Sequence, residues 1–205
     1  MILLKEGFIG KIRTAIDDIV TTLVSEDTFK DDVTAELWQA TLHAATELSA
    51  ELPINLLDVE LKWESGIIDL ERGSARMQLP DDFLRFVSLD VTGWAGSLFE
   101  LIEPGSDASK MQRSPWGRGT ATKPKAMVDH DTEGHKVIVW WPGSEEYDNA
   151  KLAYIAKPQE LEAGIKCSIR EEAERIIIYR AASIFFEGKK EETIAEKFRT
   201  LSTTY

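Results

Sequence analysis

The spacing of apolar residues changes twice along this chain of 205 residues, and these two changes constrain its fold more than any other feature. Near both ends of the sequence, apolar side chains recur every three or four residues, which is the period of an amphipathic helix. Between about Val59 and Pro158 they alternate with polar residues or form short runs bounded by Gly, Ser and Pro, which is typical of strands. The order predicts helix, helix, a β-rich insert, helix and helix.

We therefore expect an α+β protein, a helical bundle of about four helices with an inserted small antiparallel β-sheet or open barrel. The predicted divisions are an N-terminal helical hairpin over residues 1–54, a β-rich insert over 55–160 with a long basic loop at 103–125, and C-terminal helices over 161–205 that complete the bundle and end in a short tail. Hydrophobic residues make up 43% of the chain, which is enough for a globular core.

Two helices are expected before the insert. The first runs from about Gly7 to Val24, and the second begins near Asp31 or Asp32, either of which can cap it. Pro53 ends the second helix, because proline cannot donate the next backbone hydrogen bond. We expect the two to pack as an antiparallel pair. The apolar stripe of the first helix is Ile9, Ile12, Ile16, Ile19, Val20 and Leu23.

Two helices are expected after the insert. Ser168-Ile169-Arg170-Glu171 has the pattern of a capping box, in which the serine and glutamate side chains satisfy backbone N–H groups at a helix start. Gly188 is expected to end this third helix. A short last helix is predicted from about Glu191 to Leu201, followed by the tail Ser202–Tyr205.

The insert is expected to hold several short strands and one hairpin. Val137–Trp141 should pair with Leu152–Ile155 across a turn that begins at Pro142. The adjacent Trp140 and Trp141 must point to opposite faces of their strand, so one can fill the core while the other must be covered by a helix, a loop or another chain. Further strands are predicted at Val59–Trp63, Ile67–Leu70, Ala75–Leu79, Phe83–Val91 and Leu98–Ile102, with a turn at Arg72-Gly73-Ser74.

Charge and cysteine content exclude some classes of protein. The formal net charge is -12, so DNA phosphates should repel the chain at long range, which argues against a protein that reads DNA sequence but allows a wall that DNA slides past. The one cysteine, Cys167, can form no internal disulfide, which favours a reducing compartment. No apolar run reaches the roughly 20 residues that span a bilayer, and no signal peptide is recognisable, so we expect no membrane partner and a location in the cytoplasm before any assembly.

No catalytic pattern stands out, and we expect no enzyme activity and no cofactor. His130 and His135 flank a polar turn that contains Asp131, and this group could bind a metal, but a turn between strands explains it more simply. The segment Gly117–Lys123 resembles a phosphate loop only superficially, because it lacks the required spacing and leads into no helix.

The segment Lys110–Lys125 differs from the rest of this acidic chain, because it holds five basic residues and no acidic one. Trp116 lies within it, between Pro115 and Gly117. Long loops without secondary structure are often functional, so we predict a contact arm for a neighbouring subunit or another acidic protein, with Trp116 as the anchor. A nucleic-acid contact and a solvated, mobile loop remain open alternatives. The candidate interface residues are Lys110, Arg113, Trp116, Arg118, Lys123, Lys125 and Tyr205.

The order of several segments resembles the head-to-tail connector proteins of tailed phages, the adaptor rings bound beneath the portal. The insert is especially similar to that of proteins from short-tailed phages, including the crAss-like group. The segments that carry the resemblance span about two-thirds of the chain. They are Leu79-Pro80-Asp81-Asp82-Phe83-Leu84-Arg85, Trp94, Lys123-Pro124, Val137–Pro142, Tyr154–Pro158 and Ile176–Ala182.

The resemblance implies a structural virion protein at the portal–tail junction, with a helical bundle and a β insert, that assembles as a ring, commonly twelve-fold. Its implied partners are the portal protein, tail or further ring proteins, other copies of itself, and the genomic DNA that passes non-specifically through the channel. Members often grip the portal with an extended terminus or loop, which here would be Ser202–Tyr205 or Gly105–Lys125. Two other classes remain open: a cytoplasmic scaffold or protein–protein interaction module, and a metal-dependent enzyme built around His130, Asp131 and His135.

Overall fold

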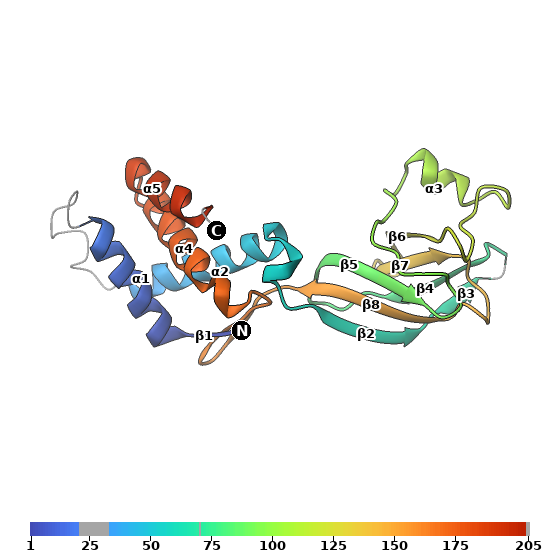
Figure 1. The fold of residues 1–205 in the computed structure, drawn as a ribbon, viewed down its shortest axis with the longest axis horizontal. Coiled ribbons are helices and arrows are strands. Elements are labelled where there is room, and N and C mark those ends of the chain that lie inside the picture. The colour runs from blue at the N-terminus through green and yellow to red at the C-terminus, as the bar shows by residue number, and fades with distance from the viewer. Residues whose placement is uncertain (21–32, 70, 204–205) are drawn as a thin grey trace. The chain divides into compact units, whose positions relative to one another are not determined.

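The computed structural model describes residues 1–20, 33–69 and 71–203, which form two compact units (Figure 1). The terminal unit joins Met1–Asp58 to Ala156–Tyr205, and the central unit is Val59–Ile155. The chain therefore leaves the terminal unit once and returns to it, so that residues from both ends of the sequence share one core.

Helix α4 organises the terminal unit, because it packs against three other helices (Figure 1). Its Phe186 is fully buried and stacks on Phe198 of α5, with ring centroids 5.8 Å apart. Arg180 on the same helix is held by Glu47 of α2 through a 2.6 Å ion pair. The helices of this unit are α1 (Lys5–Val20), α2 (Thr34–Glu51), α4 (Glu174–Gly188) and α5 (Glu192–Ser202), with short 3-10 helices at Ile54–Leu56 and Glu171–Ala173.

The terminal unit also contains a three-stranded sheet that the apolar pattern did not predict. Its order is β1 (Ile2–Leu4), β10 (Gly164–Lys166) and β9 (Gln159–Leu161), and both pairs are antiparallel. Leu3 and Ile165 lie opposite each other and are buried. Gly164 is required here, because a Cβ atom at this position would lie 2.1 Å from the carbonyl oxygen of Leu3.

The central unit is built from two sheets whose buried faces form its core. One has the order β2-β8-β5 and the other the order β3-β4-β7-β6. Trp140 of β7 and Leu152 of β8 are among its fully buried side chains. The strands are β2 (Glu60–Ser65), β3 (Ile67–Asp69), β4 (Ser74–Gln78), β5 (Phe83–Val91), β6 (Lys125–His130), β7 (Lys136–Trp141) and β8 (Asn149–Ala156).

The predicted fold class is wrong. Within the described residues the protein is mixed α/β, with five α-helices and ten strands in three antiparallel sheets, and is not a helical bundle with a small inserted sheet. The error has a physical cause, because strands of three residues such as β1, β9 and β10 are too short to display a period of two.

Two detailed predictions were also wrong. Ser168 does not cap a helix: its hydroxyl donates to the carbonyl of Ala156 at 3.2 Å, and α4 begins only at Glu174. The expected hairpin of Val137–Trp141 with Leu152–Ile155 does not form, since β7 pairs with β4 and β6 while β8 belongs to the other sheet. Apolar alternation identifies a strand and its faces but not its partner.

Several local predictions are confirmed, and others are not tested. Strand β5 spans Phe83–Val91 as expected, β3 and β4 pair across Gly73, and α4 ends at Gly188. Leu98–Ile102 is not a strand, because only Leu98 forms an isolated bridge, to Leu89. The expected cap at Asp31 or Asp32 and the helical positions Leu23 and Val24 lie outside the described residues.

The aromatic stack of the terminal unit should dominate its stability. We expect Phe186→Ala to lower the free energy of unfolding by about 3–5 kcal/mol, because it removes a fully buried ring and leaves a cavity. Urea denaturation followed by the helical circular dichroism signal measures this. The matched control is Phe99→Ala, whose ring is exposed and should change the free energy by no more than about 0.5 kcal/mol. Equal effects of the two substitutions would show that the stack is not part of the core.

Tyr154 gives a pH-dependent test of the central unit. Burial and the nearby Asp82 carboxylate, which accepts the phenol hydrogen at 3.1 Å, raise the pKa of Tyr154 to about 12. The stability that this shift contributes is complete below pH 10, the ordinary pKa of tyrosine, and is lost as the pH rises through about 12. Stopped-flow pH jumps monitored by tyrosinate absorbance should therefore show one late phase that Tyr154→Phe removes. A wild-type titration complete near pH 10 would contradict the buried hydroxyl.

Candidate protein-binding site

The basic segment of the central unit is ordered by a short helix. The sequence predicted a loop without secondary structure over 103–125, but α3 (Asp107–Met111) lies within it. Ser106 caps this helix, because its hydroxyl accepts a hydrogen bond from the backbone N–H of Ser109 at 3.2 Å. We call residues 106–119, which include α3 and the turns after it, the Trp116 loop.

The buried side chain of Gln112 holds the Trp116 loop together through hydrogen bonds to its backbone. Its side chain is buried, and its Nε2 donates to the carbonyls of Ala108 at 2.8 Å and Gly117 at 3.3 Å. Its Oε1 accepts a hydrogen bond from the buried N–H of Gly119 at 2.9 Å. One side chain therefore satisfies backbone groups on both sides of the turn that carries Trp116, which holds the turn in one conformation.

Arg118 connects the Trp116 loop to the sheet below it. Its guanidinium donates to the carbonyl of Gln112 and to the carbonyl of Glu71, each at 3.3 Å. Glu71 lies in the turn between β3 and β4, where Gly73 has a φ of +56° and leaves room for the guanidinium. The positive charge of Arg118 is thus used to fix the loop, and it is only partly accessible to a partner.

Two glycines allow the loop to approach its neighbours closely. A Cβ atom on Gly117 would lie 2.7 Å from the carbonyl oxygen of Met111, and one on Gly119 would lie 2.7 Å from that of Trp141. The Gly-x-Gly spacing that resembles a phosphate loop is therefore explained by packing.

The tip of this ordered loop presents Trp116 to solvent. Its side chain is 97% exposed, which is the highest value among the exposed large apolar residues of the described part of the chain. Met111, nearby in sequence, is 57% exposed. Covering an exposed aromatic ring with a partner lowers the free energy of the complex. Little conformational entropy is lost on binding, because the loop that carries the ring is already ordered. These are the properties of a binding anchor.

The other candidate residues differ in how available they are. Lys110 pairs with Asp107 of its own helix at 3.1 Å. Arg113, Lys123 and Lys125 are exposed, and their charges have no ion-pair partner among the described residues. Tyr205 lies outside the described residues. The structure thus places three uncompensated cations in the segment that carries Trp116.

Strand β2 presents a second apolar surface. Leu61 is 53% and Trp63 is 70% exposed, and both lie on the same face of this edge strand. Lys151 of the neighbouring β8 lies over the Trp63 ring at 5.0 Å. The sequence predicted a half-exposed strand but gave no signal that its apolar side faces solvent, because alternation does not say which face is covered.

The two tryptophans of β7 do not form an exposed apolar surface. Trp140 is fully buried and donates its indole N–H to the carbonyl of Tyr147 at 2.9 Å, while Trp141 is also buried, on the opposite face. The chain itself covers both rings, so neither one provides evidence for an interface.

The residues weighed as a possible metal site, His130, Asp131 and His135, form the turn between β6 and β7. Asp131 accepts backbone hydrogen bonds from Glu133 and His135, each at 2.9 Å, and its second oxygen lies 3.3 Å from His135 Nδ1. Desolvation would raise the pKa of Asp131, but these hydrogen bonds outweigh it and hold the pKa below its usual value. Within residues 1–20, 33–69 and 71–203 no cluster of three His, Cys, Asp or Glu side chains could hold a metal ion.

Cys167 has the environment of a core residue. It is buried in the terminal unit, and burial raises the pKa of its thiol. The thiolate that nucleophilic catalysis requires is therefore disfavoured. Of the helices in the described part of the chain, none has the length and apolar character needed to cross a membrane.

Two comparisons with known proteins found no relative of this chain. A scan against models of protein families found no match, and a search of curated proteins found none either. The functional argument therefore rests on the residues themselves and on their geometry.

Gln112 was missed by sequence reasoning, and its role can be tested. Gln112→Ala removes both donors and leaves the buried N–H of Gly119 without an acceptor, which should cost about 1–3 kcal/mol locally. We expect faster amide hydrogen exchange at Gly119 and through the Trp116 loop, measured by mass spectrometry, with little change in the terminal unit. Ser114→Ala, an exposed position in the same loop, is the control. Unchanged exchange in Gln112→Ala would mean that the loop is ordered by something else.

Proposed function

We propose that this protein is a structural assembly protein, the head-to-tail adaptor of a tailed phage, and that the Trp116 loop is one of its contacts with a neighbouring protein. The observation that carries the proposal is the almost complete exposure of Trp116 on a loop held by the buried side chain of Gln112. In this proposal the chain assembles and positions other proteins, and catalyses no reaction.

The chemistry of the Trp116 loop favours a protein partner with acidic groups around an apolar pocket. The indole supplies a large apolar contact, and the exposed cation Arg113 of the same loop can pair with a carboxylate at the edge of the pocket. The exposed Leu61 and Trp63 of β2 support a second contact, since a protein between two neighbours needs two surfaces.

The specific role of adaptor comes from the resemblance carried by segments such as Leu79–Arg85 and Tyr154–Pro158. It implies a ring beneath the portal that also meets tail or further ring proteins, in the virion at the portal–tail junction. The net charge of -12 suits the wall of a channel through which DNA slides without binding. The second candidate, a cytoplasmic interaction module, is supported by the same exposed residues and differs only in the identity of the partner.

The proposal predicts that Trp116→Ala weakens binding to the portal of the same virus. We expect a loss of at least about thirtyfold in affinity, equivalent to the roughly 2 kcal/mol typical of a buried aromatic anchor, with an unchanged melting temperature. Binding can be measured by biolayer interferometry on immobilised portal and inspected by electron microscopy for a ring. Phe99→Ala, which removes another exposed ring of the central unit, is the matched control.

Two outcomes would count against the adaptor. If the wild-type protein neither binds the portal nor forms a ring on it, the interaction module of the cell becomes the better proposal, and affinity capture with the Trp116 loop intact and removed would follow. If Trp116→Ala binds the portal as tightly as the wild type, the loop is not the contact.

A further inference from the structure

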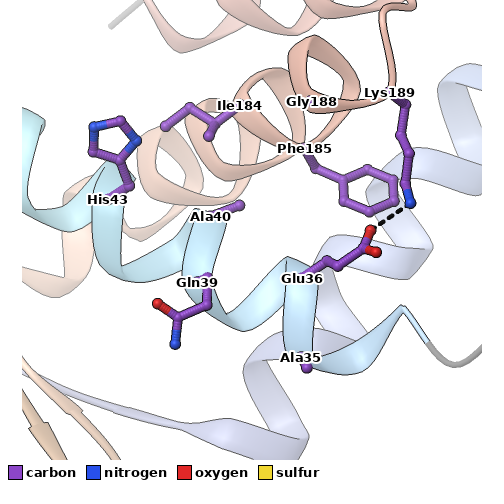
Figure 2. A pocket seen from close by; sticks show the side chains of 9 residues that line it. All are labelled: Ala35, Glu36, Gln39, Ala40, His43, Ile184, Phe185, Gly188 and Lys189. Atoms are coloured by element: carbon purple, nitrogen blue, oxygen red, sulfur yellow. Dashed lines mark ion pairs between the residues drawn. The ribbon is translucent and has the colours of Figure 1, made fainter.

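Two surfaces differ in what they offer to a partner, the pocket between helices α2 and α4 and the strand β2. In the pocket, the carboxylate of Glu36 already forms an ion pair with Lys189, as Figure 2 shows, and the apolar lining residues Ala40 and Phe185 are buried. Strand β2 of the central unit instead presents both apolar side chains and backbone groups that a partner can bind.

Strand β2 has one free edge. It lies at the border of the sheet with the order β2-β8-β5, and among the described strands none pairs with it on the side away from β8 (Figure 1). Leu61 and Trp63 are exposed on its outer face, where Trp63 lies opposite Lys151 of β8. An exposed edge strand is a template for pairing with another strand.

Every second residue of β2 points its backbone N–H and C=O to this free edge. Gly66, directly after the strand, donates to the carbonyl of Asp148 at 2.7 Å and continues the register of β2 with β8. Because the hydrogen bonds of an antiparallel pair recur at every second residue, the even-numbered residues of β2 bond to β8. The odd-numbered residues, which are Leu61, Trp63 and Ser65, therefore carry the backbone groups that face away from β8.

We infer that β2 pairs with β2 of a second copy of the chain as antiparallel strands. Outward backbone groups must meet outward backbone groups, so odd-numbered residues must lie opposite odd-numbered residues. Setting Trp63 opposite Trp63 of the second copy satisfies this condition and aligns Leu61–Ser65 of one copy with the same residues of the other in reverse order. The contact is isologous and closes with two chains, and it goes beyond the proposed function without resting on it.

The charges of β2 select this register. Lys62 lies opposite Glu64 of the second copy, at the non-hydrogen-bonded positions where cross-strand side chains are closest. Within one chain Lys62 already pairs with Glu64 at 2.6 Å, so the second copy extends this pair into a group of alternating charges and breaks no ion pair. A shift of two residues sets Lys62 against Lys62 in one direction and Glu64 against Glu64 in the other, and larger shifts leave at most half of the strand in register.

The apolar residues of the outer face gain contacts in the same arrangement. The two Trp63 rings lie opposite each other on one face, and Leu61 lies diagonal to the Trp63 ring of the second copy, within reach of an aromatic side chain. Trp63 is 70% and Leu61 is 53% exposed in the single chain. Pairing therefore removes apolar surface from water at the same time as it satisfies the backbone of the edge.

Two charge variants test the register itself. Lys62→Glu sets carboxylates opposite each other and Glu64→Lys sets ammonium groups opposite each other, so each variant alone should dimerise at least about tenfold more weakly than the wild type. An equimolar mixture of the two should form a heterodimer, because every charge pair across it is then attractive. Sedimentation velocity over a concentration series measures the association. Lys136→Glu makes the same change of charge at another exposed position of the central unit and should dimerise like the wild type.

A third variant and a second readout decide the question if a charge variant does not fold, which circular dichroism would reveal. Trp63→Ala removes the aromatic pair and should weaken the dimer at least about tenfold, whereas Phe99→Ala, which removes another exposed ring, should not. Amide hydrogen exchange of the wild type, resolved by nuclear magnetic resonance, should slow at Leu61, Trp63 and Ser65 as the protein concentration rises, because their N–H groups acquire acceptors.

Several results would overturn the inference. They are a wild type that stays monomeric at the highest attainable concentration, folded charge variants that dimerise like the wild type, and a mixture of these variants that forms no heterodimer. A dimer whose formation leaves amide exchange at Leu61, Trp63 and Ser65 unchanged uses another surface and would contradict the inference as well.

The dimer and the adaptor can fail independently. If the wild type binds the portal but stays monomeric alone, the inference fails and the adaptor proposal stands. If the wild type dimerises through β2 but does not bind the portal, the inference stands and the adaptor proposal fails. Trp116→Ala leaves β2 intact and should dimerise like the wild type.

Discussion

Strand β7 is the element on which the central unit depends, because its two adjacent tryptophans bury on opposite faces of one sheet. Trp140 fills the core, and Gly66 must be glycine since a Cβ atom there would lie 2.4 Å from that ring. On the other side, the main chain of Trp141 is in close contact with Gly119 at the end of the Trp116 loop. The end of the loop therefore packs against the same strand that carries the core residue Trp140.

These contacts explain how the loop can hold a fully exposed tryptophan without the ring packing against the rest of the protein. Gln112 satisfies the turn from within, and Arg118 ties it to the β3–β4 turn. Because the backbone of the loop is already ordered, binding of a partner over the indole costs little conformational entropy, and most of the favourable hydrophobic free energy contributes to affinity.

The sequence predicted local structure better than it predicted the fold. The long apolar alternation of Phe83–Val91 and the glycine after the α4 pattern identified a strand and a helix end that the structure confirms. The fold class was wrong because the strands of the terminal unit are three residues long, and the hairpin at Trp141 was wrong because pairing depends on contacts distant in sequence.

The sequence showed which residue types the candidate site contains, but not which contacts hold the site in place. A run of basic residues around Trp116 is visible in the sequence, and its role as a contact stays a prediction. Nothing in the sequence distinguishes Gln112 from other polar loop residues, because its importance comes from three backbone groups that only the folded turn brings to it. The outward-facing Leu61 and Trp63 were missed for a similar reason, since alternation identifies two faces without saying which is covered.

The central claim is that Trp116 becomes buried when the protein assembles. The most direct measurement is a cryo-electron microscopy map of the protein bound to the portal of its own virus, at a resolution that shows side chains. The account predicts a symmetric ring in which the Trp116 indole is enclosed by a neighbouring protein chain. A ring in which Trp116 still faces solvent, or the absence of any complex, would contradict it.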